Sequence, residues 1–270
     1  MGQDDEGGAG REYSVWTFRQ PMAFRALARY PLRDEAMQSG RSIMTENDIS
    51  TRLAAVRGRI AAAAEACGRP SSDVQLVAVS KFHPAESIAH ALEAGQRIFG
   101  ENRVQEAESK FPTLRTRWPD LRLHIIGGLQ TNKALAACRI ADVIESLDRP
   151  PLSDAIARAG DRLGRLPDLF VQINTGDEPQ KYGVPRAEAA AFIDATKRRF
   201  GDRVRGLMCI PPEDQDPRAH FAWLARTARE AELPAISMGM SADFEAAIAE
   251  GATLVRVGTA IFGARPAIGA

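Results

Sequence analysis

A lysine and two glycine- and hydroxyl-rich segments are the parts of this sequence whose residue types and spacing could do chemistry. Lys81 ends the apolar run 75–81, QLVAVSK. A lysine at the end of a strand is usually a solvated side chain. Desolvation or a nearby cation lowers the pKa of its amine and makes it a nucleophile for an aldehyde. Lys81 is therefore a candidate nucleophile if its surroundings form a ligand site.

The two glycine- and hydroxyl-rich segments are SMGMSAD at 237–243 and Gly258-Thr259-Ala260. Glycine allows close backbone approach, and free N–H groups at a helix start bind anions. Ser241 can equally be only the N-cap of the following helix, and Gly258 only a turn. Together the segments predict a phosphate site.

Arg256 lies two residues before Gly258 and so shares its face of an expected strand. A buried arginine needs a hydrogen-bond acceptor, and a ring nitrogen of a cofactor would serve. The sequence therefore predicts a site that combines an amine, a guanidinium and phosphate donors.

The elements that must position these residues alternate between short apolar runs and amphipathic segments. We predict eight strands, at 75–81, 97–102, 122–128, 143–148, 168–174, 204–210, 235–239 and 254–258. Helices are expected to begin at Pro84, Pro151 and Pro185 and to end at Gly95 and Gly251. This pattern predicts an α/β fold with a single (β/α)8 TIM barrel, whose active face lies at the C-terminal ends of the strands. An open doubly wound sheet is the alternative, but it usually has fewer strands and a glycine-rich turn after the first.

Two regions are expected in the chain. Residues 1–43 form an N-terminal extension, rich in glycine and acid at first and then in arginine, which we expect to be disordered or to reflect a mis-set start codon. A targeting peptide is the alternative. Residues 44–270 form the barrel, which begins with an extra helix carrying apolar positions at Ile49, Leu53, Val56 and Ile60 and ending at Gly68.

Composition excludes several classes of protein. Lys plus Arg and Asp plus Glu are both 35, so no basic field draws the chain onto nucleic acid or a membrane surface. No run approaches the roughly 20 apolar residues that span a bilayer. The three cysteines are odd in number and lack metal-ligand spacing, so we expect no metal and a reducing, cytoplasmic location.

Consecutive motifs in this order resemble the pyridoxal phosphate homeostasis protein family. The resemblance runs from about Met44 to Pro266. Its motifs are VAVSK at 77–81, FGENRVQE at 99–106, HIIGGLQTNK at 124–133, ESLDR at 145–149, GLMCIPP at 206–212, SMGMSADFEAAI at 237–248 and VRVGTAIFG at 255–263.

The resemblance implies a fold like the N-terminal domain of alanine racemase, with pyridoxal 5′-phosphate (PLP) held as a Schiff base on Lys81. It also implies roles for seven other residues: phosphate ligands at Ser237, Ser241, Gly258 and Thr259, the ring-nitrogen partner Arg256, Asn102 near the 3-hydroxyl group, and Met240 in the pocket lining. His124, Asn132, Lys133 and the turn 181–183 match the family pattern and are expected near the mouth, although His124 is equally explained as a core histidine.

The function implied is a PLP carrier or buffer in intracellular PLP homeostasis, without efficient catalysis. PLP enzymes usually hold the protonated ring nitrogen with an acidic residue, and an arginine cannot take that role. An arginine there also suits alanine racemase, so it does not by itself exclude catalysis. The related racemases use a tyrosine from a second domain, which we expect to be absent here, and Tyr182 is expected to serve in loop packing. We expect a monomer, with apo PLP-dependent enzymes as possible recipients. A low-activity amino-acid racemase and a non-covalent phosphate-binding barrel are the alternatives.

Overall fold

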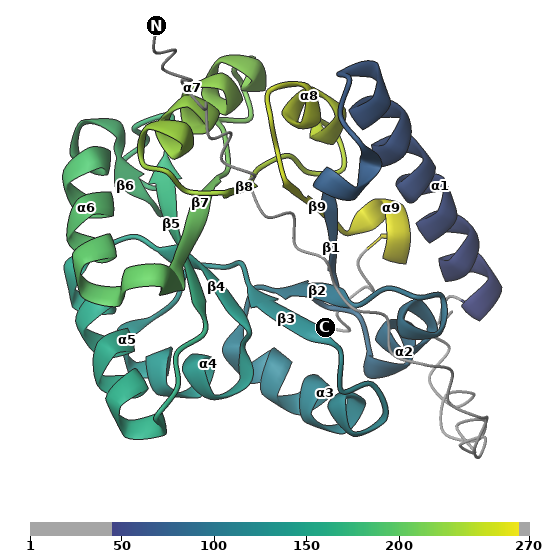
Figure 1. Cartoon of the computed structure of the whole chain (residues 1–270). Helices are drawn as coiled ribbons and strands as arrows, with labels where there is room; N and C mark the ends of the chain where they lie inside the picture. Colours follow the sequence, from purple (N-terminus) through teal and green to yellow (C-terminus); the bar gives the residue numbers. More distant parts are fainter. Residues whose placement is uncertain (1–44, 265–270) are drawn as a thin grey trace, which may run out of the picture. The chain divides into compact units, whose positions relative to one another are not determined.

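A closed ring of parallel strands dominates the computed structural model, which describes residues 45–264 (Figure 1). The extension expected at residues 1–43 lies outside the described residues. Eight strands form the ring in the described part: β1 (Gln75–Val79), β2 (Ile98–Glu101), β3 (Arg122–Ile125), β4 (Val143–Leu147), β5 (Asp168–Asn174), β7 (Val204–Cys209), β8 (Ala235–Ser237) and β9 (Leu254–Val257). The pairings β4–β5 and β1–β9 close it, and a short strand, β6 (Val184–Pro185), adds to β5. The predicted eight-stranded barrel is confirmed.

Helices surround the ring on its outer side (Figure 1). They are α1 (Glu46–Ala66), α2 (Ala85–Glu93), α3 (Val104–Arg117), α4 (Ala134–Ile140), α5 (Pro150–Leu163), α6 (Ala189–Phe200), α7 (Pro217–Glu230), α8 (Phe244–Ala249) and α9 (Thr259–Phe262). Pro84 is the N-cap of α2 and Pro151 lies in the first turn of α5, as predicted. Gly95 and Gly251 follow α2 and α8 with positive φ angles, which end those helices.

The strands end earlier than the sequence predicts. Seven predicted strands run one to three residues too far at their C-terminal ends, and only 168–174 has the observed bounds. Lys81 therefore lies in the loop after β1, and the next residue, Phe82, has a φ of 68°. The sequence remains apolar past the strand ends because residues such as Ile126 and Ile210 line a cavity there instead of extending the ladder.

The polarity of the side chains inside the barrel changes along the barrel axis. Its apolar layer consists of Val77, Val143, Phe170, Met208 and Leu254. Because side chains alternate across a strand, the residues two positions farther on face the same interior. Those residues are Val79, Glu145, Gln172, Ile210 and Arg256. The interior is therefore apolar in its middle and largely polar toward the C-terminal ends of the strands.

The extra N-terminal helix is confirmed as α1. Thr45 and Asp48 form a capping box at its start, and Gly68 follows its end with a φ of 68°. Its apolar face is buried, and it contacts α2, α8 and α9. No described helix is both long enough and apolar enough to cross a membrane.

Candidate functional site

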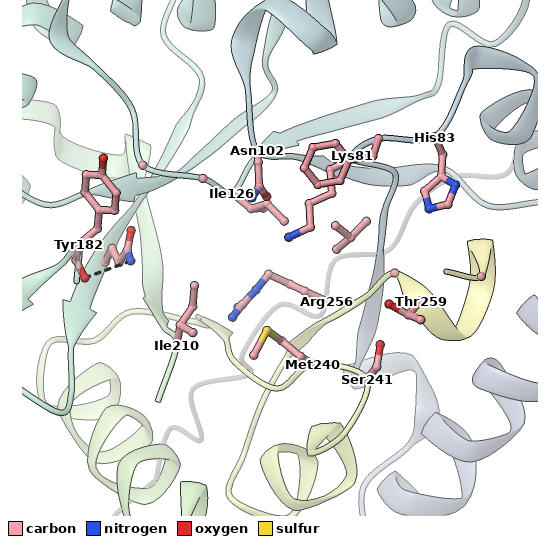
Figure 2. A pocket seen from close by; sticks show the side chains of 17 residues that line it. Lys81, His83, Asn102, Ile126, Tyr182, Ile210, Met240, Ser241, Arg256 and Thr259 are labelled. Atoms are coloured by element: carbon pink, nitrogen blue, oxygen red, sulfur yellow. Dashed lines mark hydrogen bonds between the residues drawn. The ribbon is translucent and has the colours of Figure 1, made fainter. Parts of the chain in front are cut away.

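A cavity of about 380 Å³ opens at the C-terminal ends of the strands (Figure 2). Seven of the eight predicted cofactor-binding residues line it: Lys81, Asn102, Met240, Ser241, Arg256, Gly258 and Thr259. They come from the ends of β1, β2, β8 and β9, where barrels of this type carry their sites. Ring closure brings these distant segments together.

Lys81 reaches the cavity from the loop after β1. Figure 2 shows its side chain between Asn102 and Arg256. Asn102 follows β2, and its backbone is tightly packed: a Cβ atom added to Gly127 would lie 2.4 Å from the Asn102 carbonyl oxygen. The absence of a side chain at Gly127 therefore lets the segment after β3 lie directly against the Asn102 backbone.

Ser241 and Thr259 lie beside each other at one end of the cavity (Figure 2). The short helix α9 begins at Thr259 with Gly258 as its N-cap, and both residues line the cavity, so the helix starts at this end. Gly258 also approaches β1 closely, because an added Cβ atom would lie 3.0 Å from the Val79 carbonyl oxygen. Hydroxyl groups and helix-start N–H groups at one end can hold a phosphate.

The alternative that Ser241 is only the N-cap of the following helix is wrong. Helix α8 begins at Phe244, and its N-cap position is Asp243. The Asp243 carboxylate instead accepts a hydrogen bond from the Met240 N–H group at 2.6 Å. Because residues 240–243 form a turn, the helix begins only after them, and Ser241 is among the residues that line the cavity.

Ser237, the eighth predicted residue, is fully buried beneath the cavity and does not line it. Its hydroxyl group donates to Glu145 Oε2 at 2.6 Å and accepts from Arg256 Nη1 at 2.7 Å. Arg256 Nη2 donates to the Cys209 carbonyl oxygen at 2.8 Å. Ser237 therefore anchors the arginine from below.

Glu145 extends this network, and sequence reasoning did not single it out. Its Oε1 atom lies 2.6 Å from His124 Nδ1. Burial alone would raise the pKa of this carboxyl group, but the hydrogen bond and charge of His124, the charge of Arg256 and the Ser237 hydroxyl group hold it below its ordinary value. The signal was available, because Glu145 is two residues after Val143 in a predicted strand and so faces the interior. His124 is buried in this network and does not line the cavity.

His83 lines the cavity, and sequence reasoning did not single it out. It stacks on Phe262, with ring centroids 5.2 Å apart. Burial lowers its pKa, and the charge of Lys110 lowers it further while that of Glu106 opposes. Its place two residues after Lys81 was the available signal.

Tyr182 lies at the opposite end of the cavity from Ser241 and Thr259 (Figure 2). Its side chain packs on Gly128, since a Cβ atom added there would lie 2.7 Å from the ring. It is nevertheless 58% exposed. Asn132, expected near the mouth, instead lines a separate hollow with residues of α4 and α5. Lys133 does not line the cavity either.

The donor set fits a phosphate-bearing aldehyde. One end offers hydroxyl and backbone donors, the middle offers a primary amine, and the floor offers a guanidinium held by Ser237 and Cys209. No group of His, Cys, Asp or Glu side chains within 45–264 is placed to hold a metal ion. The cavity can therefore bind an anion and present an amine to a carbonyl carbon beside it.

Comparisons with known proteins agree with this geometry. A family model described as alanine racemase, N-terminal domain, matches residues 51–266. The pyridoxal phosphate homeostasis protein of Escherichia coli is 41% identical over 230 residues, which cover 81% of this chain and 97% of that protein. The protein of the same name from Aquifex aeolicus is 39% identical over 223 residues, covering 79% and 97%.

A solved structure gives the same result. PipY of Synechococcus elongatus, with PLP bound, is 40% identical, has a TM-score of 0.69, and covers 80% of this chain and 100% of its own. The resemblance expected from the sequence is confirmed, and the chain belongs to the pyridoxal phosphate homeostasis protein family.

Proposed function

We propose that this protein binds PLP as a Schiff base on Lys81 and serves as a carrier or buffer in intracellular PLP homeostasis. The observation that carries the proposal is that one cavity brings Lys81 together with Ser241, Gly258 and Thr259. The Lys81 amine condenses with the PLP aldehyde, and one water molecule is released. The hydroxyl and backbone donors hold the phosphate, and the linkage reverses when water adds back.

Arg256 disfavours the electron-sink chemistry of most PLP enzymes, but an arginine at this place also suits an alanine racemase, so it does not by itself exclude catalysis. A guanidinium donates hydrogen bonds and has no acceptor atom, so a ring nitrogen beside it serves as the acceptor. Two of its nitrogen atoms already donate, to Ser237 and to the Cys209 carbonyl group, which keeps it in place. PLP enzymes usually place an acidic residue that keeps the ring nitrogen protonated, whereas the floor of this cavity presents an arginine.

The rim of the cavity supports apo PLP-dependent enzymes as recipients. The exposed large hydrophobic side chains of the described region are Tyr182, Ile210 and Met240, and all three line this cavity. Exposed apolar groups gathered at one place favour contact with another protein. We also propose that the protein works in the cytoplasm, where its free cysteines would remain reduced.

The covalent assignment is tested by absorbance before and after borohydride reduction, followed by peptide mapping. Wild-type protein loaded with PLP should show a reducible band and carry the label on Lys81. Lys81→Ala should lose both, while Lys133→Ala, whose lysine does not line the cavity, should keep them. A reducible band that survives Lys81→Ala would show that the covalent assignment is wrong.

The carrier assignment is tested with an amino-acid racemisation assay. We expect interconversion of L- and D-amino acids no faster than with free PLP. Faster turnover that disappears in Lys81→Ala would favour the racemase.

A further inference from the structure

A cluster of one lysine and two glutamates, largely but not fully buried, contacts the segment that carries Lys81. Glu101 ends β2, while Glu106 and Lys110 are one turn apart on α3. Lys110 Nζ donates to Glu106 Oε1 at 2.6 Å and to Glu101 Oε1 at 3.1 Å. Glu101 is fully buried, and only a tenth of the Lys110 side chain is exposed. The lysine therefore bridges two carboxylates from different elements.

The cluster makes hydrogen bonds to both chain neighbours of Lys81. Before it, the Ser80 hydroxyl group donates to Glu101 Oε1 at 2.8 Å, and the Ser80 carbonyl oxygen accepts from Lys110 Nζ at 3.2 Å. After it, the Phe82 N–H group donates to Glu106 Oε1 at 2.6 Å. Lys81 thus lies between two backbone positions held by one cluster.

The backbone that the cluster holds is strained. Phe82 has a φ of 68°, a left-handed conformation that costs about 1–3 kcal/mol for a residue other than glycine. A strained backbone persists only where its surroundings hold it. The charge-assisted bond from the Phe82 N–H group to Glu106 is such a support.

The cluster is a poor device for stability alone. Buried ion pairs rarely stabilise a fold more than apolar residues of similar size. Glu101 Oε2 is buried with no hydrogen-bond partner in the described part of the chain. Burial raises the pKa of Glu101, although the charge of Lys110 opposes the shift. What the cluster provides is a fixed backbone geometry on both sides of Lys81.

We propose that Glu106 and Lys110 are positioning residues, which hold the backbone on both sides of Lys81 so that its amine enters the cavity. The part of this inference that concerns PLP rests on the proposed function. Neither residue lines the cavity, so they act through Ser80 and Phe82. The cluster thereby slows the loss of PLP from Lys81.

Amide hydrogen exchange of the PLP-free protein tests the backbone part. Glu106→Ala should speed exchange of the Phe82 amide about tenfold or more, because a strong acceptor is lost. Glu106→Gln should restore much of the protection, because its amide oxygen can still accept the bond. Lys110→Met, the second variant, should also speed exchange of the Phe82 amide.

The rate of PLP release tests the part of the inference that concerns the cofactor. It is measured as the decay of the Schiff-base absorbance after dilution into a reagent that captures free aldehyde. Glu106→Ala should release PLP about tenfold faster than wild type. Arg115→Met is the matched control, because Arg115 lies on the same helix and pairs with Asp142, away from Lys81. It should lower the melting temperature but leave the Phe82 exchange and the release rate unchanged.

Two results would overturn the inference. The first is that the rate of Phe82 amide exchange and the rate of PLP release are both unchanged in Glu106→Ala, or in Lys110→Met if only that variant folds. The other is an equal effect of Arg115→Met. If wild-type protein does not bind PLP, the proposed function fails, while the exchange experiment still decides whether Glu106 and Lys110 position this segment.

Discussion

Arg256 connects the cavity to the interior of the barrel. It lines the cavity, yet it is only 4% exposed and is held by Ser237 and the Cys209 carbonyl group. Ser237 in turn donates to Glu145, which pairs with His124. A side chain that would otherwise sample many rotamers is therefore fixed by a chain of buried hydrogen bonds.

Arg256→Met should destabilise the protein by about 3 kcal/mol, because removing one partner leaves the buried Glu145 carboxylate under-compensated. Urea unfolding measures this loss. Arg203→Met is the control, since Arg203 pairs with Asp168 at an exposed position and should cost less than about 1 kcal/mol. Equal losses in the two variants would contradict the role of the buried network.

Glu145→Gln should change how stability depends on pH. The pKa of Glu145 in the folded protein lies below its ordinary value of 4.5, despite burial, because of His124, Arg256 and Ser237. Its ionised form therefore stabilises the fold above that value, and this contribution is lost as the pH falls through the lower folded pKa. The stability difference between wild type and variant, measured by urea unfolding from about pH 7 to about pH 3, should shrink toward acid. A constant difference would contradict the lowered pKa.

At the scale of elements, α1 supports the helices that follow the cavity strands. Arg69, just after α1, donates to the carbonyl groups of Ile248 and Ala252 at 3.0 Å and 2.9 Å. Arg59 pairs with Glu245 on α8. The helix therefore stabilises the segments that carry the phosphate donors.

Leu53→Ala should destabilise the protein by about 3 kcal/mol, because Leu53 is 1% exposed in the face that α1 buries. Arg52→Ala, at the exposed neighbouring position, should change stability by less than about 0.5 kcal/mol. Thermal or urea unfolding compares the two. A small loss for Leu53→Ala would mean that α1 is not packed as described.

The loop between β8 and α8 depends on Gly239. Its φ is 88°, and an added Cβ atom would lie 2.5 Å from the Ala247 Cβ atom. Gly239→Ala should cost roughly 3 kcal/mol and weaken PLP binding, because strain and a clash combine next to Met240 and Ser241.

Gly164→Ala separates these two causes. Gly164 has a φ of 64° but no atom within 4 Å of an added Cβ. It should therefore cost about 1 kcal/mol through backbone strain alone and leave PLP binding unchanged. Fluorescence titration with PLP, with unfolding measured in parallel, checks both variants. Equal effects on binding would show that the Gly239 contact does not shape the site.

At the scale of the whole molecule, we predict a monomer. The cavity is lined by residues of one chain, so a second copy is not needed to complete it. Size-exclusion chromatography with light scattering should give the mass of one chain at low micromolar concentration, with or without PLP. A stable dimer under those conditions would contradict this prediction.

Much of the architecture was predictable because it rests on local patterns. Alternation along each strand placed Val77, Val79 and Lys81 on one face, and the number of apolar runs predicted eight strands. Proline and glycine marked helix ends through their backbone preferences. Seven of the eight cofactor-binding residues predicted with the help of the motifs line one cavity.

How deeply each side chain lies within the barrel was not predictable from these local patterns. Ser237 and Ser241 look alike in the sequence, but one is buried beneath the cavity and the other lines it. That difference depends on strand register and on where β8 ends, which are set by neighbouring strands and not by local pattern.

The sequence alone thus determined the barrel, the candidate lysine and the family, because side-chain alternation, turn residues and motifs are properties of short segments. Only the tertiary structure decided that Glu145 and His124 support Arg256 through Ser237. It also decided that Glu106 and Lys110 bond to the residues on either side of Lys81. These contacts join residues on different elements, and the packing of those elements brings the residues within hydrogen-bonding distance.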